Sequence, residues 1–238
     1  MRVTKFGDNL LQVTRMWVIN MYLVRETDGL TLIDSGTRGS EKDILAAAKA
    51  TGLPLQRVVL THAHVDHAGS FDALRAALPD AAFLTGARTA DFLRGDKSLK
   101  PGEVLSELRG GFVQAETVPD RLLVPGDQVG SLRVLAAPGH SPDQIAFLDE
   151  RDGTLIAGDA YQTQGGIAVS GVLRWRFPMP AMATWDLATA VQTARDLAAL
   201  QPARLAVGHG RVLEQPGAAM ARAIAEAEGK LDVHAQTA

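Results

Sequence analysis

Residues 57–69 read Arg57-Val58-Val59-Leu60-Thr61-His62-Ala63-His64-Val65-Asp66-His67-Ala68-Gly69. The apolar start predicts a short strand, and the polar residues after it predict a loop at a sheet edge, where binding sites are commonly built. In extended backbone, side chains two residues apart point the same way, so His62 and His64 can reach one metal ion together. Asp66 and His67 are neighbours that point differently, which suits a second ion close by. Imidazole and carboxylate donors without a thiolate favour Zn²⁺ first, then Mn²⁺, Fe or Co.

Further polar residues stand directly after other predicted strands. Asp34 follows the strand Leu30–Ile33, and His140, Asp159 and His209 follow the strands Leu132–Ala136, Thr154–Ala157 and Arg204–Val207. Taken singly, these are an ordinary loop histidine, a turn-forming aspartate and a core histidine. Taken together with the cluster at 62–67, they place five of the six histidines at strand ends. We therefore expect one site built from several loops.

The remaining pattern predicts a mixed α/β chain. Apolar runs predict further strands at Leu10–Val13, Trp17–Val24, Arg57–Leu60, Ala82–Leu84, Arg121–Val124 and Gln144–Leu148. Apolar periodicity and breakers predict helices at Glu41–Ala50, Ser70–Leu78, Ala87–Leu93, Thr184–Leu200 and Gly217–Leu231. Ser40 and Asp43 have the spacing of a capping box, and Arg94–Gln114 is expected to be a mobile insertion. Two stacked sheets with helices outside, a four-layer αββα arrangement, fit this order, although periodicity alone does not select it over another α/β fold.

Composition limits the classes of function. The net charge is −3 with no cluster of lysine and arginine, which disfavours a nucleic-acid partner. There are no cysteines, so disulfides and thiolate metal sites are excluded. Asp8 and Arg15 interrupt the apolar runs near the start, and no run reaches the ~18–20 residues of a membrane span. We expect a single domain over residues 1–238, cytoplasmic and without a membrane partner, with a tail that frays from about residue 232.

The motifs together resemble those of the metallo-β-lactamase superfamily. They are Ile33-Asp34-Ser35-Gly36, Thr61-His62-Ala63-His64-Val65-Asp66-His67, Pro138-Gly139-His140-Ser141, Gly158-Asp159 and Gly208-His209-Gly210, in the family's order and rough spacing. The resemblance implies an αββα sandwich of two mixed sheets with two metal ions, Zn²⁺ first and Fe or Mn as alternatives, at one end of the sheets. It implies that the first ion is bound by His62, His64 and His140. It implies that the second is bound by Asp66, His67 and His209, with Asp159 bridging the two and Asp34 as a buried support.

The resemblance also implies an activity. A hydroxide held between two ions ~3.5–4 Å apart would attack an ester, lactone, thioester or amide carbonyl of a small molecule, and Asp66 would orient it or carry a proton. Two alternatives on the same fold stay open. One is an iron oxidoreductase similar to persulfide dioxygenases, which lack the complete second site present here; the other is an RNA-processing nuclease, which needs basic surface. A β-lactamase proper would need an export signal.

Substrate contacts are predicted at two places. Tyr161 follows Asp159 by two residues and is expected to donate a hydrogen bond to a substrate carbonyl, because lactone-cleaving members of the family use a tyrosine in this neighbourhood. The loop Gly171–Thr184 holds Trp175 and Met179, among other apolar residues, and could wall a pocket, act as a packed lid or make a homodimer contact.

Overall fold

Two β-sheets lie face to face in the computed structural model, which describes residues 1–237 and the side chains of residues 1–232. The first sheet runs in chain order: β1 (Arg2–Phe6), β2 (Leu10–Arg15), β3 (Ile19–Glu26), β4 (Gly29–Ile33), β5 (Leu55–Val59), β6 (Ala82–Gly86) and β7 (Arg121–Leu123). The second has the order β15 (Leu213–Glu214), β14 (Arg204–Ala206), β11 (Thr154–Ile156), β10 (Ile145–Asp149), β9 (Leu132–Ala136) and β8 (Gln128–Val129). A small third sheet pairs β12 (Tyr161–Gln162) with β13 (Ala168–Val169).

Both large sheets are mixed. In the first, β1 to β4 form an antiparallel meander, and β4 to β7 are parallel. In the second, β11 and β14 are parallel and the other pairs are antiparallel. Parallel strands end at the same edge of a sheet, so the loops after β4 and β5, and those after β11 and β14, are brought together.

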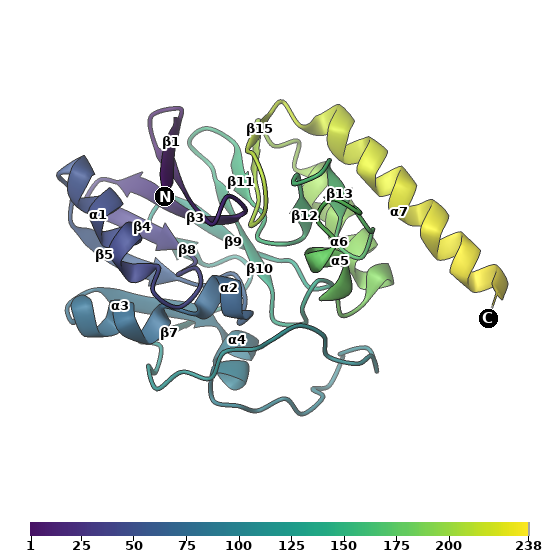
Figure 1. Cartoon of the computed structure of the whole chain (residues 1–238), viewed down its shortest axis with the longest axis horizontal. Coiled ribbons are helices and arrows are strands. Elements are labelled where there is room, and N and C mark those ends of the chain that lie inside the picture. The colour runs from purple at the N-terminus through teal and green to yellow at the C-terminus, as the bar shows by residue number, and fades with distance from the viewer. Residues whose placement is uncertain (238) are drawn as a thin grey trace.

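Helices cover the two outer faces. On one side lie α1 (Glu41–Thr51), α3 (Phe71–Ala77) and α4 (Ala87–Leu93), and on the other α6 (Leu187–Ala199) and α7 (Gly217–Thr237). Figure 1 shows α1 and α3 on one side of the strands and α6 and α7 on the other. Two one-turn helices, α2 (Val65–Ala68) and α5 (Met179–Met182), belong to loops.

Three hydrophobic clusters separate the four layers. Between the sheets lie Tyr22, Val24 and Ile33 of the first with Val134 and Phe147 of the second. The two outer clusters join the first sheet to α1, α3 and α4, and the second to α6 and α7. Strand β3 is buried on both faces, because consecutive side chains point into different clusters. This is the predicted αββα sandwich of two mixed sheets.

Some local predictions were wrong or incomplete. Ser40 precedes α1 but does not cap it through its side chain; its Oγ accepts a hydrogen bond from Arg15 Nη1 (2.8 Å). Helix α7 extends to Thr237. The structure describes side chains only to residue 232, so the fraying expected from about residue 232 lies outside the described residues. Within the described residues, no helix is both long and apolar enough to cross a membrane.

Candidate metal centre

The loop after β5 presents its polar side chains in two directions. His64 has extended backbone (φ −65°, ψ 152°), and the one-turn helix α2 begins immediately after it. The backbone N–H groups of His67 and Ala68 both donate to the His64 carbonyl oxygen, at 3.0 and 2.8 Å. The turn therefore gives Asp66 and His67 a different direction from His64, while the His67 ring still lies against His62, with centroids 4.1 Å apart.

Three buried imidazoles form a first set. His62 Nε2 lies 3.1 Å from His64 Nδ1, which lies 3.0 Å from Nε2 of His140. All three side chains are almost completely buried. The predicted first ligand set is thus assembled from the end of the first sheet and the loop after β9.

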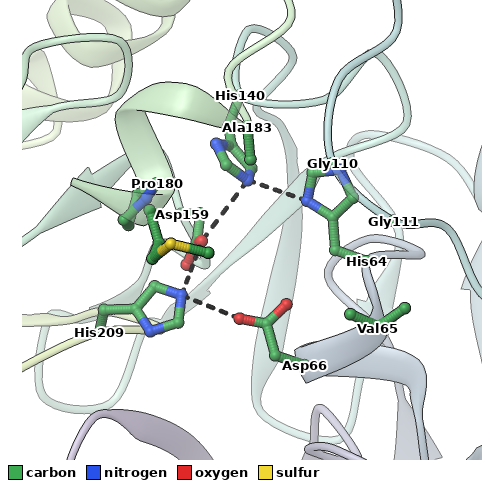
Figure 2. A pocket seen from close by; sticks show the side chains of 11 residues that line it. His64, Val65, Asp66, Gly110, Gly111, His140, Asp159, Pro180, Ala183 and His209 are labelled. Carbon is green, nitrogen blue, oxygen red and sulfur yellow. Dashed lines mark hydrogen bonds and ion pairs between the residues drawn. The ribbon is translucent and has the colours of Figure 1, made fainter. Parts of the chain in front are cut away.

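A second set lies beside it, made of Asp66, His67 and His209. The Asp66 Oδ2 atom is 3.2 Å from His209 Nε2 and 3.9 Å from His67 Nε2. Asp159 lies between the two sets: its Oδ2 is 3.1 Å from His209 Nε2 and 3.5 Å from His140 Nε2, and its Oδ1 is 3.4 Å from His67 Nε2. Figure 2 shows Asp159 and Asp66 pointing into the space that His64, His140 and His209 surround.

The outer nitrogen of each imidazole has an acceptor. His64 Nε2 and His209 Nδ1 face the carbonyl oxygens of Arg109 (3.0 Å) and Val18 (2.9 Å), which can only accept. His67 Nδ1 faces Asp34 Oδ2 at 2.7 Å. The other two outer nitrogens face threonine hydroxyls that already donate elsewhere: His62 Nδ1 faces Thr61 Oγ1, and His140 Nδ1 faces Thr184 Oγ1.

In the neutral form of each imidazole the inner nitrogen therefore carries the lone pair, and these nitrogens face one another and the carboxylates. His67 Nε2 and Asp159 Oδ1 are buried and have no hydrogen-bond partner among the described residues. Lone pairs facing lone pairs at 3.0–3.1 Å are stabilised by a cation between them. The all-nitrogen-and-oxygen donor set fits Zn²⁺ and other divalent transition metals. The residues present therefore fit a divalent metal, in three overlapping groups of potential ligands: His62, His64 and His140; His62, His67 and Asp159; and Asp66, His67 and His209.

The electrostatics of the two sets differ. Burial lowers the pKa of His62 well below its ordinary value and that of His140 to about 3. Burial alone would also lower the pKa of His67 and His209. The negative charges of Asp159 and Asp66 outweigh this effect at both histidines. They raise the pKa of His67 well above its ordinary value and that of His209 to about 10. The first set presents neutral imidazoles, and the carboxylates beside the second set favour positive charge there.

Asp34 supports the centre by holding the outer nitrogen of His67. It follows β4 directly, is buried, and has a left-handed backbone (φ +64°) that aspartate tolerates better than most residues. Its Oδ1 accepts from the Thr61 N–H (2.7 Å) while its Oδ2 accepts from His67. Outer carboxylates of this kind fix the orientation of a metal-binding imidazole.

A pocket of about 240 Å³ opens on this centre. Its walls include His64, Asp66, His140, Asp159 and His209 and the apolar or small residues Val65, Gly110, Gly111, Met179, Pro180 and Ala183. The loop Gly171–Thr184 contributes to it through two residues of α5, Met179 and Pro180, and through Ala183 directly after that helix. Its Trp175 is 80 % exposed and does not line the pocket.

The role expected for Tyr161 was wrong. Its side chain is completely buried in the cluster under α6 and α7, and its hydroxyl donates to the Ala194 carbonyl oxygen (2.7 Å). The residue begins β12, whose pairing with β13 turns it away from Asp159 and into the core. It therefore cannot reach a substrate in the pocket.

Two contributors to the site were not predicted. Asp143 is buried, accepts from the Ala63 N–H at its Oδ2 (2.8 Å) and from Ser141 Oγ at its Oδ1, and so joins the two loops of the first histidine set. The second contributor is the segment around Gly110 and Gly111. The only sequence signal for it was the glycine pair, which permits close approach of backbone to another group.

The sequence is similar to those of known proteins. The sequence model of the metallo-beta-lactamase superfamily matches residues 14–209. The uncharacterized protein YobT of Bacillus subtilis (strain 168) is 44 % identical over 232 residues, covering 96 % of this chain and 99 % of that protein. The hydroxyacylglutathione hydrolase of Rhodospirillum rubrum is 30 % identical over 151 residues, covering 61 % of this chain and 48 % of the relative.

Among solved structures, TTHA1623 in a di-iron-bound form superposes with a TM-score of 0.64 at 27 % identity, covering 86 % of this chain and 94 % of the other. The fold, the converging histidines and aspartates, and the family match over most of its length agree: the chain belongs to the metallo-β-lactamase superfamily.

Proposed function

We propose that the chain is a hydrolase that uses two divalent metal ions to cleave an ester, lactone, thioester or amide bond of a small molecule. One observation carries the proposal: the inner nitrogens of five buried imidazoles face one another or Asp159, while an acceptor faces every outer nitrogen. The similarity to a hydroxyacylglutathione hydrolase supports hydrolysis as the reaction. The donor set favours Zn²⁺, and the di-iron form of TTHA1623 makes iron the second choice.

Bound metal ions would supply a Lewis acid for the carbonyl and lower the pKa of the attacking water. The chain's own residues supply proton transfer and shape. Asp66 lines the pocket, its side chain is 28 % exposed, and its Oδ2 lies 3.2 Å from His209 Nε2. We assign it the task of accepting a proton from the attacking water and passing it to the leaving group. Hydrolysis adds the hydroxyl of one water to the acyl carbon and its proton to the leaving atom, so no further reactant is needed.

The pocket supports a small substrate with an apolar portion. Val65, Met179 and Pro180 give parts of the lining apolar character, and the histidines and aspartates make the polar part. A reacting carbonyl would lie against the polar part, and its substituent would lie against Met179, which is 62 % exposed.

The test combines metal content with a substrate panel. We expect about two zinc ions per chain by elemental analysis, and hydrolysis of at least one ester, lactone, thioester or β-lactam substrate. Chelation should abolish the activity and added Zn²⁺ should restore it. Asp66→Asn should lower kcat by about 10²–10⁴-fold, the usual range for a lost general acid–base group.

Two results would favour the alternatives instead. About one iron per chain with little zinc, together with oxygen consumption on a persulfide, would identify an oxidoreductase. Cleavage of structured RNA without activity on small acyl substrates would identify a nuclease.

We also propose that the protein acts in the cytoplasm, without a nucleic-acid or membrane partner, as a homodimer joined through the loop Gly171–Thr184. The net charge of −3 supports the lack of a nucleic-acid partner. The exposure of Trp175 (80 %), Met179 (62 %) and Met182 (63 %) on one loop supports the second. Light scattering that gives the mass of one 25.3 kDa chain would refute the dimer.

A further inference from the structure

The segment between α4 and β7 carries the second unexpected feature of the site. Apart from an isolated bridge at Phe112, residues 94–120 form neither helix nor strand. Figure 1 shows this segment as a long loop below α2 and α4. The sequence predicted a mobile insertion at Arg94–Gln114, yet part of it, Ser106–Val113, is tied to the metal centre by several contacts. We call Ser106–Val113 the strap.

The strap holds the backbone on both sides of His64. The Val65 N–H donates to the Gly111 carbonyl oxygen (2.9 Å), and the Val113 N–H donates to the Ala63 carbonyl oxygen (2.8 Å). The Phe112 ring lies against the His64 ring, with centroids 4.6 Å apart. The histidine is therefore enclosed by a segment that lies 45 residues further along the chain.

The strap also determines which His64 nitrogen is free. The Arg109 carbonyl oxygen lies 3.0 Å from His64 Nε2 and can only accept, so Nε2 carries the proton and Nδ1 carries the lone pair. It is Nδ1 that faces His62 and His140.

At its other end, the strap reaches the loop that holds His140. Ser106 Oγ donates to the Trp185 carbonyl oxygen (2.8 Å), and Trp185 Nε1 donates to the Ser106 carbonyl oxygen (3.3 Å). The Trp185 N–H donates in turn to the His140 carbonyl oxygen (2.8 Å). One segment thus contacts the loop of His62 and His64 directly and the loop of His140 through Trp185.

Gly110 is the point of closest approach. It has a left-handed backbone (φ +83°), and a Cβ atom built on it would lie 2.6 Å from His64 Nε2, with the other two nearest atoms also in the His64 ring. A side chain at this position would therefore press on the His64 ring, and the ring would have to move.

From these contacts we infer that the strap is a positioning element for the metal centre: it holds His64 with Nδ1 toward His62 and His140, and so sets the metal affinity of that set. The inference rests on the proposed function only in requiring that the centre bind metal.

The experiment compares two alanine substitutions in the same loop. Gly110→Ala pushes on the His64 ring, whereas Gly102→Ala is its matched control: Gly102 has nearly the same φ (+89°) but no atom within 4 Å of a built Cβ. Both substitutions strain the backbone alike, so the difference between them isolates the contact with His64. The measurements are Zn²⁺ affinity by competition with a chromophoric chelator, the visible absorption of the Co²⁺-loaded protein, and the melting temperature of the metal-free protein.

We expect Gly110→Ala to weaken the affinity for one of the two ions by about 10–100-fold, the usual range when a group that orients a ligand is disturbed. The Co²⁺ absorption should change in Gly110→Ala alone, while the metal-free proteins melt at similar temperatures. Equal affinities and spectra for the two variants would overturn the inference.

If Gly110→Ala does not fold, Ser106→Ala serves instead. This substitution removes only the hydroxyl that is bonded to Trp185, and an unchanged metal affinity of Ser106→Ala would equally overturn the inference. A wild-type protein that binds no metal would refute the proposed function, whereas normal metal binding by Gly110→Ala would refute only the role of the strap.

Discussion

The most informative single substitution is Asp34→Asn, because it keeps the shape of the side chain and removes its charge. Asparagine also tolerates the left-handed backbone found at this residue (φ +64°), so little backbone strain is added. The carboxylate accepts from the Thr61 N–H (2.7 Å), the Thr61 hydroxyl and His67 Nδ1 (2.7 Å). An amide has one accepting oxygen, so its NH₂ group must face either Thr61 or the His67 N–H, and one charge-assisted bond is lost.

The size of the effect follows from that bond. A hydrogen bond to a charged group contributes about 1.5–3 kcal/mol. At about 1.4 kcal/mol per tenfold change, this corresponds to a loss of roughly 10–100-fold in metal affinity, in agreement with measured effects of outer-shell partners on metal binding. We expect the loss at the ion bound by His67, with the other ion retained.

The assay is metal content after dialysis against a competing chelator, read beside the melting temperature of the metal-free protein. Asp149→Asn is the control, since Asp149 is equally buried (3 %) but pairs with Arg151 at 2.6 Å, outside the metal centre. Both variants should lose stability, and only Asp34→Asn should lose metal. If Asp34→Asn keeps both ions with affinities within twofold of wild type, then Asp34 does not orient His67 for metal binding.

Three further outcomes are expected. Tyr22 and Tyr161 are the only tyrosines, and burial raises the pKa of both well above 10.0, so the folded protein should show no tyrosinate absorbance at 295 nm when the pH passes 10. The stability that these two phenols contribute is present below pH 10 and falls as the pH rises above it; ordinary titration near pH 10 in the folded state would contradict their burial. Tyr161→Phe should leave kcat/KM within about twofold but cost about 1–3 kcal/mol in urea unfolding, because the Ala194 carbonyl oxygen loses its donor, and a large loss of kcat would return Tyr161 to a catalytic role. Gly208→Ala should reduce metal content, because a Cβ atom there would collide with Asp159 Oδ1, and full metal content by elemental analysis would show that the carboxylate can move aside at no cost.

The metal-binding pattern could be predicted from sequence because it is local. His62 to His67 lie within six residues, and the direction of each side chain follows from a strand end and one helical turn. The other expected ligands also stand directly after strands, and parallel pairing brings His209 beside Asp159. The alternation of strands and helices predicted a mixed α/β chain, and the resemblance of the motifs selected the four-layer fold.

The wrong or missing predictions depend on contacts between distant residues. Tyr161 has a spacing from Asp159 that suits a site residue, but a two-residue strand pairing turns it inward. The strap has the composition of a mobile loop. Its order comes from contacts with His64, which lies 45 residues before Arg109 in the chain. Ser40 has the spacing of a capping box, but its hydroxyl is bonded to Arg15, which is 25 residues away.

The donors of the centre are divided between the two sheets. Asp34 and His62 to His67 stand at the end of the first sheet, and His140, Asp159 and His209 stand at the end of the second. An ion bound there would fasten the two halves of the sandwich at one edge, and its binding free energy would be lost when either half opened. Metal release and the loss of tertiary structure should therefore occur in one common transition on heating. The bound ions would make the two sheets unfold together as one cooperative unit.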